Sequence, residues 1–373
     1  MLQNDLREGL EASPSWMQDF LGDLPAKKHS VSESAGRKSV RKRRVRGMNP
    51  ADQQIIASSG ADRQGLFNTT AGRVGTTVEN IEKDFWVRWT LDILFNRLKS
   101  GGPRLLFKGG TSLSKACDLI SRFSEDIDIT VFRSDLGKTA TLEPLESQGK
   151  KKRENLLDDI KAACQDHRAK PLRLELDALA GQTMDAAGKD PSTLRIVVYD
   201  QDPDRKSLLI HDPSAVERSA YVHPVVRIES GAKSAVDANE NRTITAYRAP
   251  DFTPGDLTVT GVTTIIAART FLDKILLLRG VASYYDARGA LRGGGRRSRH
   301  YDDVHRLMRA SVGETAGADH ALIEGCVCQG CAAVTRAGDF LNPMTLAFAP
   351  VTPANEASDA AGCARRFRQG NRQ

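Results

Sequence analysis

Residues 105–131 combine a short apolar run, paired glycines, a helical stretch and a second apolar run that carries two aspartates. Residues 105–107 predict a buried strand, the glycines at 109–110 end it, and residues 111–119 predict a helix. The alternating, β-branched residues 127–132 predict a second strand. With the long helices and short strands elsewhere in the chain, this arrangement indicates an α+β fold.

The two aspartates of this segment, Asp126 and Asp128, suggest a metal site. They are two residues apart on a strand, so both side chains leave the same face. Ile127 and Ile129 alternate with them and predict that the opposite face packs into a core. Ordering two like charges without a compensating cation is costly, and such carboxylates suit Mg²⁺.

The glycine turn before the helix suggests a place for a phosphate. Backbone N–H groups at the start of a helix and the hydroxyls of Thr111 and Ser112 are suitable donors. Taken singly, each signal has a simpler explanation, since paired glycines often form only a turn and two strand aspartates often form a solvated edge. The order and spacing of the parts favour the functional interpretation.

Other elements follow from periodicity. Thr76 and Glu79 have the spacing of a capping box, and an amphipathic helix of about 20 residues is expected behind them. Within it, Lys83 and Asp84 are interpreted as a charge pair on the helix flank and Trp86 as a core aromatic. Further expected helices and strands are a helix over 62–74, a helix over 153–164, strands over 195–199, 224–229 and 243–247, a helix over 263–283 and a helix over 300–310.

Six segments of the sequence resemble the AbiEii/AbiGii toxin family of the polymerase-β-like nucleotidyltransferase superfamily, whose members include type IV toxin–antitoxin toxins. The resemblance runs from about Arg63 to Met308. The segments that carry it are Ile81–Val87, Lys108–Lys115, Arg122–Asp128, Ile228–Lys233, Arg269–Lys274 and Ser298–Val304. It implies a nucleotidyltransferase core with a mixed sheet, followed by a mostly helical C-terminal region.

The resemblance also implies roles for individual residues. Asp126 and Asp128 would bind the catalytic Mg²⁺, with Glu229 as a third carboxylate. Lys274 would contact the triphosphate from a helix flank, contributing little to the core, and Asp303 would support the site from a neighbouring helix. The nucleotide phosphates would be held by Gly109, Gly110, Thr111, Ser112 and Lys115.

The implied activity is transfer of a nucleoside monophosphate from an NTP to an acceptor. The family leads us to expect that this acceptor is RNA, and specifically tRNA. The outcome would be growth arrest and phage defence, restrained by a cognate antitoxin. Residues 326–373 lack the apolar helix usual in the family, which leaves open an inactive homologue that binds nucleotide or RNA. Modification of a small molecule or a protein hydroxyl is the other alternative.

Composition and charge indicate the domain organisation and the cellular location that we expect. The net charge is +7, and residues 1–47 hold ten Lys/Arg against six Asp/Glu, which predicts a disordered basic tail. Six scattered cysteines, the absence of a signal-peptide pattern and the absence of a long apolar run predict a cytoplasmic protein without membrane spans. We expect domains at 48–250 (nucleotidyltransferase) and 251–325 (helical), followed by a divergent or poorly ordered tail at 326–373.

Three further features stay open. Cys326, Cys328 and Cys331 have close spacing but no evident fourth zinc ligand. The arginines of residues 288–299 form either a solvated loop or a contact to an RNA backbone. His300 is expected to be a structural residue beside the active site.

Overall fold

The computed structural model describes residues 47–121, 124, 126–137, 150–216, 225–232, 238–246, 257–288, 298–323 and 325–326. The expected basic tail, apart from Gly47, lies outside the described residues. So do the C-terminal tail beyond Cys326, with Cys328 and Cys331, and most of the Gly/Arg loop.

The chain divides into two compact units. The sheet unit contains the described parts of residues 35–141 and 155–266, and the helical unit contains those of 142–154 and 267–373. The sheet therefore continues past residue 250, where the sequence placed the domain boundary, because one further strand follows it.

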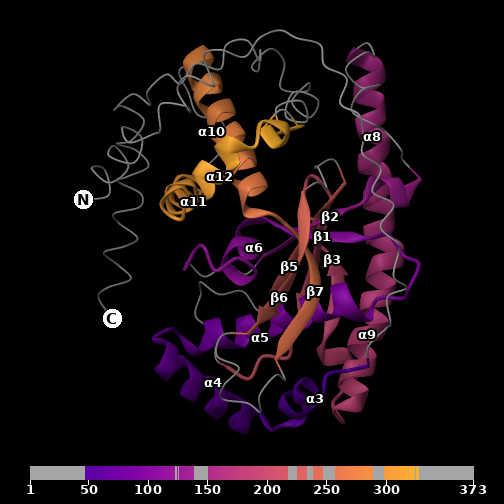
Figure 1. Cartoon of the computed structure of the whole chain (residues 1–373). Helices are drawn as coiled ribbons and strands as arrows, with labels where there is room; N and C mark the ends of the chain where they lie inside the picture. Colours follow the sequence, from indigo (N-terminus) through magenta and orange to yellow (C-terminus); the bar gives the residue numbers. More distant parts are fainter. Residues whose placement is uncertain are drawn as a thin grey trace. The chain divides into compact units, whose positions relative to one another are not determined.

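Over the described residues the sheet has seven strands in the order β3-β4-β5-β2-β1-β7-β6. Figure 1 shows the sheet, with most of its strands labelled. The β2–β5 and β1–β7 pairs are parallel and the other pairs are antiparallel, so the expected mixed sheet and α+β class are confirmed. The strands are β1 (Leu105–Lys108), β2 (Ile127–Val131), β3 (Arg195–Val198), β4 (Ser207–His211), β5 (Val225–Gly231), β6 (Asn239–Thr245) and β7 (Thr258–Ile265).

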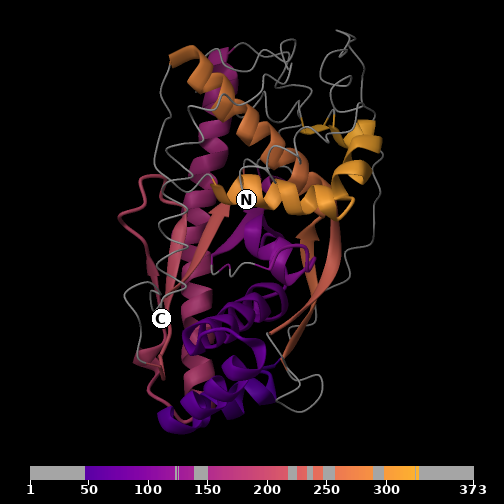
Figure 2. The same cartoon turned by 90° about the vertical axis from the view of Figure 1, so that its left-hand side faces the viewer.

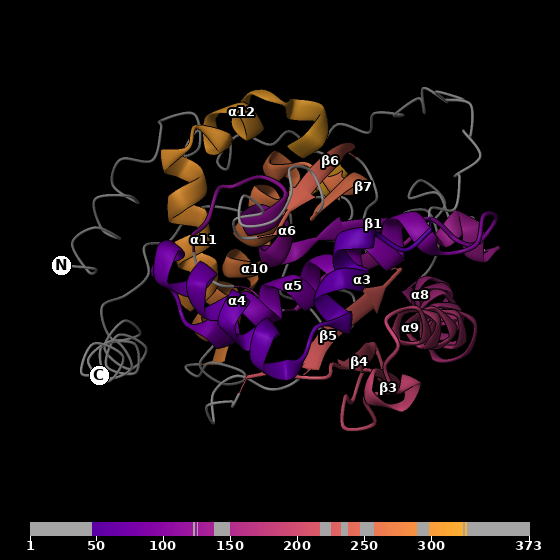
Figure 3. The same ribbon diagram turned by 90° about the horizontal axis from the view of Figure 1, so that it is seen from below.

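Helices pack on the sheet, and α5 contacts both β5 and β7. Figure 3 views this layer from the side of α3, α4 and α5. Figure 2 shows α8, η3 and α9 following one another as a long, nearly continuous rod. The helices of this part of the chain are α3 (Pro50–Ala57), α4 (Gly60–Val74), α5 (Val78–Asp92), η1 (Ile93–Arg97), α6 (Gly109–Lys115), η2 (Arg133–Leu136), α8 (Lys150–His167), η3 (Arg168–Leu172), α9 (Arg173–Ala186) and η4 (Pro191–Thr193).

Helix α5 forms the centre of the core. Every residue from Ile81 to Asp92 is buried, including Trp86 and Trp89, whose rings meet edge to face at 5.6 Å. Trp86 is a core aromatic as expected. The helix begins one residue later than expected: Thr77 is the N-cap and accepts a hydrogen bond from the Asn80 backbone, while Thr76 accepts one from the Asn80 side chain.

Some elements differ from the sequence prediction. The expected helix over 263–283 begins only at Ala267, because the β-branched run that precedes it forms β7. Helix α9 was missed because its buried stripe of Leu176, Ala180, Thr183 and Met184 is only partly apolar. Helix α3 and strand β4 were missed as well.

The helical unit contains α10 (Ala267–Arg288), α11 (Ser298–Arg309) and α12 (Val312–Ala318), which contact one another. A mostly helical C-terminal region is thus confirmed for the described part of the chain. None of the described helices combines the length and apolar character needed to cross a bilayer.

Candidate active site

A row of polar residues crosses four strands on one face of the sheet. The register pairs Lys108 with Asp128, Asp128 with Glu229, and Glu229 with Ser207. Directly paired residues share a face, so these side chains line up across β1, β2, β5 and β4. We call Asp126, Asp128 and Glu229, the acids in and beside this row, the acidic row. Buried apolar residues occupy the other face: Phe107, Ile127, Ile129, Leu208, Val226 and Ile228.

The carboxylate of Asp128 packs against the backbone of Gly109, the first residue of α6. Gly109 has φ +81°, and a Cβ placed on it would lie 2.1 Å from Asp128 Oδ2. Only glycine combines this backbone conformation with the missing side chain. The paired glycines therefore do more than turn the chain: they bring the start of α6 against a carboxylate of the acidic row.

The environment of Asp128 makes its charged form less favourable than that of an exposed aspartate in the metal-free protein. Burial raises its pKa to about 6; Lys108 opposes this, and the negative charges of Glu229 and Asp126 add to it. A cation bound at the row would remove this penalty.

The hydroxyls behind the glycines are engaged inside the protein. Thr111 Oγ1 lies 2.7 Å from Ser124 Oγ and donates to the Asp126 carbonyl, and Ser112 Oγ donates to the Gly109 carbonyl at 2.9 Å. Both residues are buried. The two contacts of Thr111 fix α6 to the residues that lead into β2, whereas the Ser112 bond lies within α6. A direct role of the two hydroxyls, or of half-buried Gly110, toward phosphate stays a prediction.

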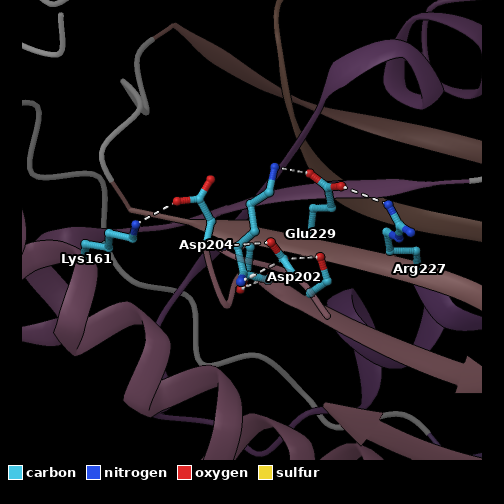
Figure 4. A network of polar contacts seen from close by, with 8 residues as sticks. Lys161, Asp202, Asp204, Arg227 and Glu229 are labelled. Carbon is cyan, nitrogen blue, oxygen red and sulfur yellow. Dashed lines mark hydrogen bonds and ion pairs between the residues drawn. The ribbon is translucent and has the colours of Figure 1, made fainter. Parts of the chain in front are cut away.

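Two cations hold Glu229. Lys206 Nζ lies 2.6 Å from Glu229 Oε2, and Arg227 Nη1 lies 3.6 Å from Oε1 (Figure 4). Burial acts to lower the pKa of Lys206, but its hydrogen bond to Glu229 and the charges of Glu229, Asp202 and Asp128 raise it overall. The expectation that Glu229 faces the metal did not include these partners: Lys206 is 23 residues away in the sequence, and Arg227, two residues away on the same strand, was overlooked.

Charged residues of α5 contact three different parts of the sheet unit. Glu82 accepts hydrogen bonds from Ser214 Oγ and the Ala215 backbone, and Lys83 donates to the Val225 carbonyl at the start of β5. Asp84 forms an ion pair with Lys115 of α6. The expected charge pair between Lys83 and Asp84 is therefore wrong, because each side chain reaches a separate element.

The Lys115 side chain is more deeply buried than we expected for a residue that contacts a nucleotide. Its side chain is 4% exposed and that of Asp84 is 1% exposed. The pair joins α6, which carries Gly109, to the core helix α5. In this arrangement the Lys115 ammonium is committed to Asp84.

Lys274 and Asp303 meet within the helical unit. Lys274 Nζ lies 2.9 Å from Asp303 Oδ2, with side-chain exposures of 10% and 0%, and 3.4 Å from His300 Nδ1. The expectation that Lys274 sits on a helix flank and contributes little to packing is wrong, since the pair bridges α10 and α11. His300 is a neighbour of this pair.

The acidic row supplies suitable donors for Mg²⁺. Mg²⁺ in proteins is commonly held by one or two carboxylates, with waters and substrate phosphates completing the shell, so Asp126 and Asp128 fit it. Within the described ranges, no group of three or more His, Cys, Asp or Glu side chains is arranged to hold a metal. Glu229 is accordingly not a ready-made third ligand while Lys206 and Arg227 hold it.

Comparisons with known proteins agree with these features. The sequence model of a family described as nucleotidyl transferase AbiEii toxin, type IV TA system, matches residues 92–353. No curated protein shows a significant match. A solved structure that resembles this one is MenT4, a nucleotidyltransferase toxin from Mycobacterium tuberculosis H37Rv, with 13% identity, 72% of this chain and 98% of that chain covered, and a TM-score of 0.33. A likeness at that identity and TM-score does not define this fold, whereas the family match spans most of the chain. This protein belongs to the AbiEii nucleotidyltransferase toxin family of type IV toxin–antitoxin systems.

Proposed function

We propose that this protein is a Mg²⁺-dependent nucleotidyltransferase that transfers a nucleoside monophosphate from an NTP to an RNA hydroxyl, with tRNA as the acceptor class. Transfer in the cytoplasm would arrest growth, and a cognate antitoxin would restrain it. The reaction releases pyrophosphate, as expected for the EC 2.7.7 class.

The observation that carries this proposal is the contact of Asp128 with Gly109. It brings an acidic strand residue against the start of the glycine-led helix, where the sequence predicts the triphosphate. Asp126 directly precedes β2 and its negative charge acts on Asp128, and the raised pKa of Asp128 in the metal-free protein is consistent with a carboxylate that binds a cation.

Bound Mg²⁺ would neutralise phosphate charge and lower the pKa of the attacking hydroxyl. Asp126 and Asp128 would hold it, while the hydrogen bonds of Thr111 keep α6 against the residues that lead into β2. Gly109, Gly110, Thr111, Ser112 and Lys115 remain the candidates for nucleotide contact. Lys274 remains the candidate for contact with the triphosphate, and Asp303, its ion-pair partner, the acid that supports it.

Ligand-dependent melting tests the site without knowledge of the acceptor. Mg²⁺ with an NTP should raise the thermal midpoint of the wild type, because a ligand stabilises only the state that binds it. Asp126→Asn and Asp128→Asn should abolish that rise and leave the metal-free protein at least as stable. Asp204→Asn is the matched control, since Asp204 is an exposed acid that pairs with Lys161 at 2.7 Å.

A transfer assay tests the reaction itself. The protein is incubated with Mg²⁺, each labelled NTP in turn and total RNA, and the products are separated on a gel. Label on RNA that Asp128→Asn abolishes is the expected result. Label on protein or a small molecule would refute the RNA acceptor, and no label with any NTP would favour an inactive, nucleotide-binding homologue.

A further inference from the structure

Hydrogen bonds fix the backbone of Lys206, while its side chain remains accessible to solvent. Its N–H donates to Asp202 Oδ2 at 3.0 Å, and its carbonyl accepts from the Ser230 backbone at 2.8 Å. Asp202 also accepts hydrogen bonds from the Asp204 backbone and from Ser207 Oγ, which fixes the turn before β4. The Lys206 side chain is 44% exposed, so its ammonium can move without disturbing the core.

The two cations that hold Glu229 differ in how they are anchored. Arg227 lies two residues before Glu229 on β5, and its guanidinium is 5.1 Å from the centre of the Tyr199 ring. Such stacking retains the guanidinium in place. The Lys206 ammonium has Glu229 as its short contact, at 2.6 Å, and has no aromatic partner among the described residues. Of the two cations, Lys206 is therefore the one that can leave.

The Lys206 ammonium also interacts with the negative charges of the acidic row. Glu229 is the direct cross-strand neighbour of Asp128, so a charge at Glu229 lies beside the carboxylate that packs on Gly109. Lys206 interacts with the negative charges of both Glu229 and Asp128. The Lys206 ammonium therefore balances part of the negative charge of the acidic row in the absence of metal.

We infer that Lys206 is a built-in counter-cation of the acidic row: it holds Glu229 while the divalent ion is absent and yields it when the ion binds. This rests on the proposed function, because it requires that the row binds Mg²⁺. Lys206 is then a positioning residue, since it acts on the metal site through Glu229. The exchange also explains why Glu229 is separate from a three-carboxylate cluster in this structure.

The test is a titration of the full chain with Mg²⁺ alone at constant ionic strength, in which the thermal midpoint is measured at each Mg²⁺ concentration. Lys206→Met removes the competing ammonium and keeps an unbranched side chain of similar length. It should tighten the apparent Mg²⁺ affinity by about three- to tenfold, because the ammonium no longer neutralises Glu229. Lys206→Arg, which keeps the charge, should remain close to the wild type.

Two controls separate this role from a general charge effect. Lys161→Met removes a lysine of the same network, 33% exposed and paired with Asp204 instead of Glu229, and should leave the Mg²⁺ affinity unchanged. In a Glu229→Gln background, Lys206→Met should lose most of its effect, because the carboxylate through which it acts has gone.

The outcomes are distinguishable. If the wild type responds to Mg²⁺ and Asp128→Asn does not, but Lys206→Met titrates like the wild type or more weakly, the inference is overturned and the metal site stands. If neither the wild type nor Asp128→Asn responds to Mg²⁺, with or without an NTP, the proposed metal site fails and the inference fails with it.

Discussion

Replacing Gly109 with alanine tests the geometry on which the site depends. The new Cβ would lie 2.1 Å from Asp128 Oδ2, 2.9 Å from its Cγ and 3.0 Å from its Cβ. The left-handed backbone costs about 1–2 kcal/mol for any L-residue, and overpacking of this kind costs about 1–3 kcal/mol more. Gly109→Ala should therefore lower the free energy of unfolding by about 2–5 kcal/mol.

The chain offers a matched control for the backbone component. Gly75 also has a positive φ, +72°, but a Cβ there would meet nothing within 4 Å. Gly75→Ala should cost only about 1–2 kcal/mol, so the difference between the two variants measures the contact with Asp128. In an Asp128→Ala background, Gly109→Ala should lose most of that difference.

Urea denaturation of the metal-free protein, followed by circular dichroism, gives these free energies. Where Gly109→Ala remains folded, it should also have lost the stabilisation by Mg²⁺ and NTP, because Asp128 has been displaced. Equal costs for Gly109→Ala and Gly75→Ala would refute the packing of Asp128 on Gly109, and with it the arrangement of the site.

Three other predictions concern charged groups. In EDTA, the raised pKa of Asp128 means that the folded state binds a proton more tightly than the unfolded state. The stability that this protonation contributes is therefore lost as pH rises from about 4 to 6. Asp128→Asn should lack this pH dependence, and equal pH profiles of denaturation for the two proteins would contradict the prediction. Lys274→Met should destabilise the protein by about 3–5 kcal/mol because it removes the positive charge of a buried ion pair and keeps the negative one, and adding Asp303→Leu should restore most of that loss in calorimetry; a mild single variant would count against the buried pair. Asp84→Asn should be destabilising for the same reason, and combining it with Lys115→Met should recover stability, whereas additive losses would show that the two side chains do not interact.

Local sequence was sufficient for the elements that carry the chemistry. The glycine pair between a strand and a helix, and the alternation of Asp126 and Asp128 with isoleucines, are set by residues close together in the chain. Backbone sterics and strand periodicity act over such short separations, so β1, the turn and β2 could be predicted. The family resemblance of these segments agrees with the match over residues 92–353.

The partners of the charged residues depended on tertiary structure. Lys206 reaches Glu229 and Asp84 reaches Lys115 only because strand order and helix packing bring distant segments together. Pairing register follows from the whole sheet, and no local pattern specifies which cation will neutralise which buried acid. For the same reason residues 263–265, the end of β7, were assigned to the following helix: they are extended because β1 and β6 flank them, and that arrangement exists only in the folded sheet.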